Sequence, residues 1–137
     1  GRRALSKSEL QRRLIRGGAA EADAQAAADW LEDIGAVDDP AYAAAVVRDY
    51  GRRGYGSARI REELRRRGVP REFWEVALEE LPDSEDILDD LIRKRCRGDL
   101  SDPREVKRLS DGLLRRGFSW SQVKEALSRY TELPTED

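Results

Sequence analysis

A short basic helix that ends at a glycine recurs along this chain, and this recurrence limits the possible folds more than any other feature. The clearest copy, residues 59–69, reads R-I-R-E-E-L-R-R-R-G-V. Matching Gly68 to Gly117 also matches the basic pair before each glycine and the apolar positions on both sides. A fainter copy ends at Gly18, so the unit returns about every fifty residues. A repeat of this length predicts a tandem array of small helical modules.

The alternative explanation is that amphipathic helix pairs can always be aligned to some degree. Here the glycine, the basic pair and the apolar positions agree together, which argues for a true repeat. Glycine suits the left-handed residue after a helix, and the valine or phenylalanine that follows it can supply the usual apolar contact of the cap.

Capping signals and apolar spacing around each copy predict a chain of helices. We expect helices over residues 21–34, 40–52, 57–67 and 70–80, with one before them and three after. The stripe of the 21–34 helix should extend to Ile34. No segment shows the sustained period-two pattern of a strand. The expected caps are Ser6 with Glu9, Asp39 before Pro40, Asp102 before Pro103, and Ser119 with Gln122.

The predicted fold class is therefore all-α, with tandem three-helix repeats forming an elongated, curved array. Residues 1–38 would form a first, truncated repeat, residues 39–81 a second, residues 82–131 a third, and residues 132–137 a tail. The chain begins without methionine, and we expect it to be a fragment that lacks N-terminal residues.

The residue types that are missing argue against an enzyme. The chain has no histidine, the usual general base and the commonest zinc ligand, and its single cysteine is Cys96. Without a base, a catalytic role for Cys96 is not expected, although its cationic neighbours could lower its pKa. The acidic run at residues 83–90 has no calcium-loop glycine and is better explained as a solvated helix face. We expect no catalytic residue, no metal and no cofactor.

Charge is strongly segregated along the chain, although the formal net charge is only -2. Residues 51–71 contain eight arginines and two glutamates, whereas residues 79–90 contain seven acids and no base. Arginine side chains bind carboxylates and phosphates through paired hydrogen bonds, so a cluster of them suits an acidic protein groove or a nucleic-acid backbone. The alternative is a solvated face with local ion pairs to Glu62 and Glu63.

The candidate partner-binding residues combine this basic segment with its two tyrosines and the matching basic positions of the last repeat. Tyrosines are included because aromatic side chains often anchor interfaces. The set is Arg48, Tyr50, Arg52, Arg53, Tyr55, Arg59, Arg61, Arg65, Arg66, Arg67, Lys107, Arg108, Arg115 and Arg116. Gly54 and Gly56 match no phosphate-binding fingerprint and are expected to shape the backbone.

Hydropathy shows no membrane span and no signal peptide. We therefore expect a cytoplasmic protein without membrane contact, acting as a monomer.

Several segments resemble the bacterial RecX family. They are G-Y-G-S-A-R-I-R-E-E-L-R-R-R-G-V with the preceding V-V-R-D-Y, the early L-E-D-I-G-A-V-D-D, and the late L-L-R-R-G-F-S. The resemblance covers nearly the whole chain, and the first repeat departs from it most. It implies a modulator, usually a negative regulator, of the RecA recombinase. It also implies a curved chain of three-helix repeats that lies in the groove of the RecA–DNA filament.

Two functional hypotheses follow. The first is an interaction protein that binds the RecA filament, with possible contacts to DNA phosphates, and inhibits its ATPase and recombinase activities. The second is a stand-alone DNA-binding protein in which residues 59–81 form a helix-turn-helix. Against the second hypothesis, the later helix of that pair is acidic and would face the negative DNA backbone.

Overall fold

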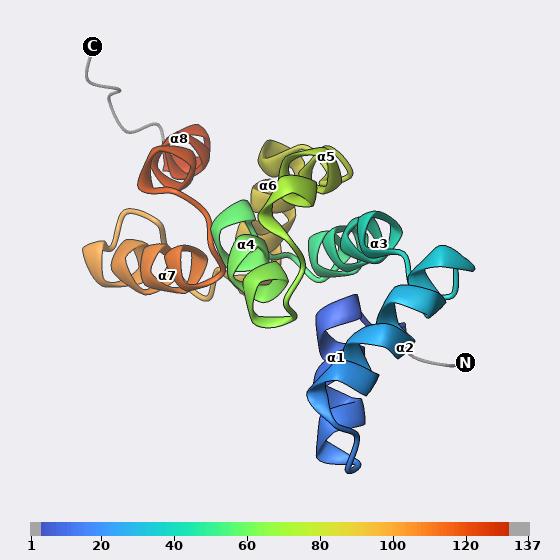
Figure 1. Cartoon of the computed structure of the whole chain (residues 1–137). Coiled ribbons are helices and arrows are strands. Elements are labelled where there is room, and N and C mark those ends of the chain that lie inside the picture. The colour runs from blue at the N-terminus through green and yellow to red at the C-terminus, as the bar shows by residue number, and fades with distance from the viewer. Residues whose placement is uncertain (1–3, 132–137) are drawn as a thin grey trace. The chain divides into compact units, whose positions relative to one another are not determined.

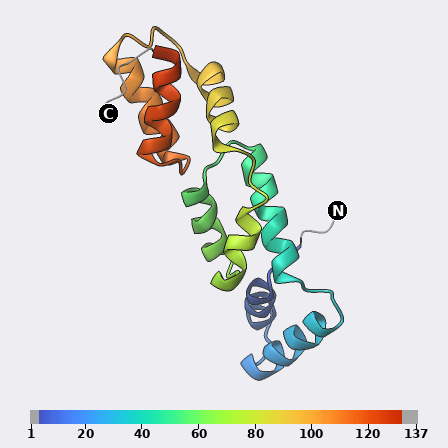
Figure 2. The same ribbon diagram turned by 90° about the horizontal axis from the view of Figure 1, so that it is seen from above.

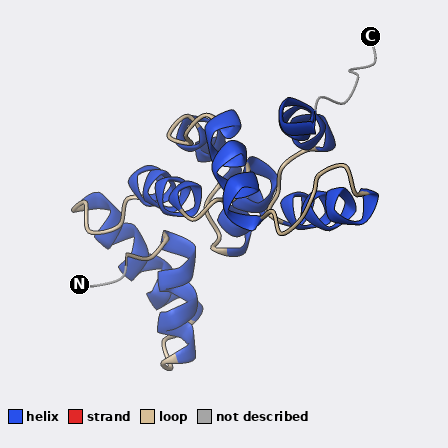
Figure 3. Cartoon of the chain, turned by 180° about the vertical axis from the view of Figure 1, so that it is seen from behind, coloured by secondary structure: helices blue, strands red, loops and turns tan. Residues whose placement is uncertain are grey.

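A computed structural model describes residues 4–131, which form helices and connecting loops without any strand (Figure 1 and Figure 3). The predicted all-α class is confirmed. Within these residues the elements are α1 (Lys7–Arg16), α2 (Glu21–Asp33), α3 (Asp39–Arg52), α4 (Ser57–Arg66), the 3-10 helix η1 (Arg71–Phe73), α5 (Trp74–Leu78), α6 (Ser84–Arg95), α7 (Pro103–Arg115) and α8 (Trp120–Thr131). The tail predicted at residues 132–137 lies outside the described residues.

The helices belong to two compact units. Among the described residues, the first contains residues 4–47 and 61–80, and the second contains residues 48–60 and 81–131. Helices α3 and α4 each contribute to both units. The units follow contacts in space and the repeats follow the sequence, so the repeat boundaries remain a prediction.

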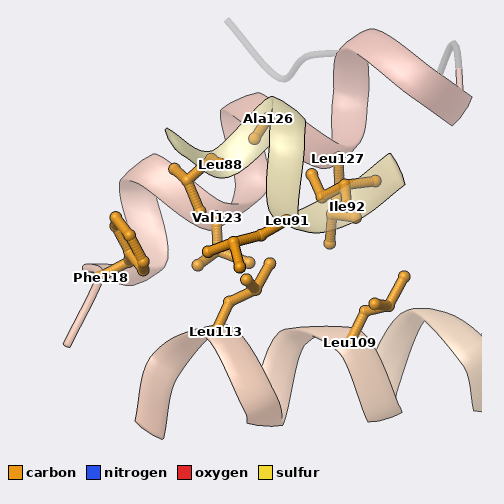
Figure 4. Packing of buried hydrophobic residues seen from close by; sticks show 9 residues of the cluster. All are labelled: Leu88, Leu91, Ile92, Leu109, Leu113, Phe118, Val123, Ala126 and Leu127. Atoms are coloured by element: carbon orange, nitrogen blue, oxygen red, sulfur yellow. The ribbon is translucent and has the colours of Figure 1, made fainter. Parts of the chain in front are cut away.

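The core of the second unit lies among α6, α7 and α8, which pack together at the C-terminal end of the chain (Figure 2). Leucines at helical spacing point from α7 toward the side chains of α6 and α8 (Figure 4). This apolar stripe is what drives the three amphipathic helices together. The core residues are Leu88, Leu91, Ile92, Leu109, Leu113, Phe118, Val123, Ala126 and Leu127.

In the first unit, α1 packs on α2, and its start confirms the predicted capping box. The Ser6 hydroxyl accepts a hydrogen bond from the backbone N–H of Glu9, whose carboxylate accepts from the N–H of Ser6, both at 3.0 Å. These bonds satisfy two donors that the start of a helix leaves without partners.

The predicted role of Asp39 as the cap of α3 is wrong. Asp38 performs it instead, since its carboxylate accepts from the N–H of Ala41 at 3.1 Å. Asp39 is 3% exposed and accepts from the N–H of Lys7 at 2.8 Å, at the start of α1. Burial raises the pKa of its carboxyl. Of two adjacent aspartates, the second is thus used to cap a distant helix.

Two further predictions on the helices need correction. Residues 70–80, predicted as one helix, form η1 and the five-residue α5. Ile34 is 56% exposed instead of packed, because α2 ends at Asp33 and Ile34 leaves the helical conformation.

Among the described residues, each unit has a close contact between the start of one helix and the end of another. In the second unit, the N–H groups of Gly56 and Ala58 donate to the carbonyls of Arg116 and Gly117, at 2.7 and 3.2 Å. Unpaired donors at the start of α4 are therefore satisfied by unpaired acceptors at the end of α7.

In the first unit, the matching contact joins the start of α1 to the end of α4. The Ser6 hydroxyl donates to the carbonyl of Arg67, and a Cβ added at Gly68 would lie 2.6 Å from the side chain of Ser8. Gly68 and Gly117, which the repeat aligns, therefore take the same place in two equivalent contacts. Both have positive φ angles, 74° and 98°. We refer to these contacts as the helix-end junctions.

Replacing Gly117 by alanine should unfold the protein far more readily than replacing Gly18. Both glycines have positive φ, 98° and 108°, so each alanine should cost about 1 kcal/mol through backbone strain. Only at Gly117 would the new Cβ also lie 2.4 Å from the backbone nitrogen of Arg59, whereas at Gly18 it meets nothing within 4 Å. This overpacking should add about 1–3 kcal/mol to the loss in the free energy of unfolding. Urea unfolding of both variants measures the difference, and equal losses would contradict the steric role of the junction.

Candidate partner-binding surface

The structure divides the candidate residues between the two units. Arg61, Arg65, Arg66 and Arg67 lie in the first unit, and the other ten lie in the second. Each group is therefore considered on its own.

Tyr50 and Tyr55 form an aromatic pair in the second unit, between the end of α3 and the start of α4. Their ring centroids are 5.3 Å apart and the rings are tilted by 42°. Tyr50 is 6% exposed, whereas Tyr55 is half-buried. Tyr50 thus anchors the pair in the protein, and Tyr55 carries the aromatic surface outward.

Three arginines surround this pair. The guanidinium carbon of Arg53 lies 4.7 Å from the ring centroid of Tyr50, and that of Arg116 lies 4.8 Å from the centroid of Tyr55. The guanidinium carbon of Arg59 lies 5.6 Å from the ring centroid of Tyr50 and 5.5 Å from that of Tyr55. Cations at these distances are attracted to the negative face of the ring. The structure therefore brings five predicted residues, from both sides of the α4–α7 junction, into one arginine–tyrosine cluster.

Arg116 is held in this cluster by carbonyl groups. Its Nη1 donates to the carbonyls of Arg53 and Gly54, at 2.9 and 3.2 Å. These bonds orient the guanidinium without neutralising its charge. Burial, together with the nearby charge of Arg95, lowers the pKa of Arg116 from its very high ordinary value, so the group stays charged in an unfavourable setting.

Gly54 is needed where Arg116 approaches. It has a φ of 85°, and a Cβ there would lie 3.1 Å from Leu91 and 3.3 Å from Arg116. The glycine thus shapes the backbone around the cluster, as its sequence context predicted.

A cleft of about 580 Å³ lies beside the cluster. Its lining combines the basic side chains of Arg52, Arg53, Lys94 and Arg95 with the acidic Asp86 and Asp90. Arg52 and Arg53 also pair with Asp49 at 3.7 and 3.3 Å, but these side chains are at least half exposed, so the pairs are weak. Arg95 is absent from the predicted set. It belongs to the basic run at residues 93–97, which could extend the basic surface of residues 51–71, but the sequence does not indicate its place beside Arg116.

The four predicted arginines of the first unit have close carboxylate partners. Arg61 pairs with Glu75 at 2.7 Å, and Arg65 pairs with Glu62. Arg66 and Arg67 both pair with Glu63, at 2.7 and 2.8 Å, and Glu63 is fully buried. This arrangement resembles the local ion pairs considered as the alternative in the sequence.

Arg67 is part of the fold of the first unit. It is half-buried and also donates to the hydroxyl of Tyr42 at 3.0 Å. Burial opposes its charge, but the hydrogen bonds to Glu63 and Tyr42 outweigh burial and raise its pKa. In the repeat, Arg67 aligns with Arg116, and Glu63 aligns with Gly112. The carboxylate that neutralises Arg67 is therefore missing at the equivalent position before Arg116.

Glu63→Gln should destabilise the protein by about 3 kcal/mol, because it removes the buried negative charge that pairs with Arg66 and Arg67. The control is Glu62→Gln, one residue earlier on an exposed part of α4, which should change the free energy of unfolding by less than about 0.5 kcal/mol. Denaturant unfolding of both variants checks this, and similar small effects would show that Glu63 has no structural role.

On α7, the predicted residues Lys107 and Arg108 also have local partners. Lys107 pairs with Asp111 at 2.6 Å. Arg108 pairs with Glu105 at 2.8 Å and donates to the carbonyl of Arg95 at 2.6 Å. Arg115 is exposed at the end of the helix. Lys107 and Arg108 are exposed as well, so all three side chains can reach a partner.

Glu105 ties the loop before α7 to the helix. Its carboxylate accepts from Arg108 and from the backbone N–H of Arg97, the latter at 2.6 Å. The bond from Arg108 and then that from Arg97 lower the pKa of Glu105 from its ordinary 4.5 to about 2.

A lowered pKa in the folded protein means that ionised Glu105 stabilises the fold above the ordinary value of 4.5 and loses this effect as the pH falls toward about 2. The difference in Tm between the wild type and Glu105→Gln should therefore be largest above pH 5 and shrink toward pH 2. Thermal unfolding of both proteins across this range measures it. A difference that stays constant with pH would exclude the stabilising role of the carboxylate.

The acidic side chains and the thiol that were considered for metal binding or catalysis make structural contacts. Asp83 caps α6 through the N–H of Glu85, and Asp89 pairs with Arg129, at 2.9 and 2.8 Å. The thiol of Cys96 donates to the carbonyl of Gly98 at 3.0 Å. Residues 4–131 contain no group of three His, Cys, Asp or Glu side chains arranged to hold a metal ion. Over the same range, every helix is too short or too polar to cross a bilayer.

Comparison with known proteins identifies a family that this chain matches. Residues 38–78 match the model of the second three-helix domain of RecX, and residues 83–127 match that of the third. The chain is 38% identical over 132 residues to a protein of Chromohalobacter salexigens, which covers 96% of this chain and 87% of that protein. It is 40% identical over 128 residues to one from Xanthomonas axonopodis pv. citri, covering 91% and 78%. A Pseudomonas fluorescens protein is 36% identical over 129 residues, covering 93% and 83%. All three are named Regulatory protein RecX.

Proposed function

Because this chain belongs to the RecX family of regulatory proteins, we propose that it binds the RecA–DNA filament in its groove and inhibits its ATPase and recombinase activities. The observation that carries the proposal is the arginine–tyrosine cluster of the second unit, where Arg53, Arg59 and Arg116 surround Tyr55. Their guanidinium groups can bind the carboxylates or the phosphates that such a filament presents.

Restraint of these side chains favours binding. A free arginine loses much rotamer freedom when a partner fixes it, and this loss weakens binding. The rings of Tyr50 and Tyr55 and the carbonyls around Arg116 already limit that freedom in the unbound protein. Less entropy is therefore lost when a partner binds.

The predicted residues accordingly take different parts in the proposal. Arg52, Arg53, Arg59, Arg115 and Arg116 form the principal contact surface in the second unit, with Tyr55 as an aromatic contact. Arg65 and Arg66 are exposed on the first unit and can add contacts there. Arg67 supports the fold through Glu63 and Tyr42.

The alternative of a stand-alone helix-turn-helix protein has little support. Its recognition helix would be α5, which spans only five residues. Glu75 lies on it, exposed, and Glu72 lies just before it in η1. A helix this short and acidic is poorly suited to the major groove.

The test is the ATPase activity of RecA filaments preformed on single-stranded DNA. The wild-type chain should lower it at substoichiometric or near-stoichiometric amounts. The double variant Arg52→Gln with Arg53→Gln should need at least about tenfold more protein to reach the same inhibition. The reason is that it loses two charged hydrogen-bonding groups of the contact surface.

A matched control comes from the adjacent arginine pair of α1. Arg12 and Arg13 are also exposed, and replacing both by glutamine makes the same change in net charge outside the proposed surface. This control should inhibit like the wild type. Equal potency of both double variants would contradict the assigned surface, and no inhibition by the wild type over a wide concentration range would contradict the function.

A further inference from the structure

A second groove lies in the C-terminal part of the second unit and takes no part in the proposed filament contact. It has a volume of about 730 Å³ and is formed by α7, the start and end of α8, and the loop before α7. Its size is sufficient for a few side chains of a bound segment.

Large apolar side chains line this groove although they are open to solvent. Leu114 is 41% exposed, Trp120 is 55% exposed and Tyr130 is 40% exposed. Single exposed apolar residues are common, but several that converge on one concave site mark an interaction surface.

Ser110 supplies an independent sign that something binds there. It also lines the groove, is 7% exposed, and its hydroxyl has no hydrogen-bond partner. Across residues 4–131 it is the one buried side-chain oxygen or nitrogen in this condition. Buried hydroxyl groups are almost always paired, so an unpaired one is a place where a bound group can supply the missing hydrogen bond.

The charges along the groove favour a basic partner. Lys107 and Asp111 neutralise each other through a contact of 2.6 Å. Asp99 remains. Its carboxylate accepts from the N–H of Ser101 at 2.8 Å and interacts with the Ser101 side chain, and a carboxylate can accept further hydrogen bonds beyond these. The groove therefore offers an apolar surface beside a negative charge.

We propose that this groove binds an extended segment of a partner protein that carries an apolar anchor residue beside a lysine or arginine. The anchor packs among Leu114, Trp120 and Tyr130, and the basic residue faces Asp99. The segment is extended because its backbone N–H and C=O groups are then unpaired and can bond to the Ser110 hydroxyl. In a helix these groups are already paired. The inference stands independently of the proposed binding to RecA.

Selection of a random-peptide phage library on the full chain tests the proposal. The double variant Leu114→Ser with Trp120→Ser serves for counterselection, and it should stay folded because both side chains are exposed. Enriched peptides should share an aromatic or aliphatic residue next to lysine or arginine. As synthetic peptides, they should bind the double variant at least about tenfold more weakly than the wild type.

Ser110→Ala distinguishes a binding role from a structural one. Removing an unpaired hydroxyl should leave the Tm of the free protein unchanged or raised. It should also lower the affinity for the selected peptides about threefold to tenfold. A merely structural serine would not separate these two effects.

Three results would overturn the proposal. The first is no enrichment on the wild type over the double variant. The second is enrichment of acidic or helical peptides. The third is self-association of the wild type in sedimentation that the double variant abolishes, because a second copy would then occupy the groove.

Discussion

The helix-end junction is the contact on which the rest of this structure depends. At each junction the last carbonyls of one helix accept hydrogen bonds from the start of another, at Arg116 and Gly117 in one unit and at Arg67 in the other. Groups that helix ends normally leave to water or to capping side chains are satisfied by a second helix. Such close approach requires a residue without a Cβ, which is why glycine occupies both Gly68 and Gly117.

The same junction assembles the proposed contact surface. Because α4 begins against the end of α7, Arg59 from one helix and Arg116 from the other reach the ring of Tyr55. Tyr50 fixes that ring from its buried position. The packing of the repeat thus brings together cations that are more than one repeat apart in the sequence. The two junctions differ in whether a carboxylate is present beside the arginine that precedes the glycine. Glu63 neutralises Arg67 in the first unit, whereas Gly112 stands at the matching position before Arg116.

Much of the fold could be predicted from the sequence because its signals are local. Capping residues, glycines and apolar spacing located the helices, and the alignment of Gly68 with Gly117 located the junctions without indicating what they touch. The failures arose where local signals were ambiguous. Asp38 and Asp39 are equally good caps, and only the distant N–H of Lys7 decides between them. In the candidate surface, the sequence identified the arginines but could not separate those near carboxylates from those on aromatic rings. It also could not place Arg95 beside Arg116 or reveal the groove around Ser110, because both depend on packing between helices.

We propose that the arginine–tyrosine cluster of the second unit, together with the adjacent Arg52, contacts the RecA filament. Phenylglyoxal, which modifies accessible guanidinium groups, tests it directly when the modification of each arginine is measured by mass spectrometry with and without filaments. The account predicts that Arg52, Arg53 and Arg116 become protected when filaments are bound, while Arg12 and Arg13 in α1 react as before. Unchanged modification of Arg52, Arg53 and Arg116 in a chain shown to be filament-bound would contradict it.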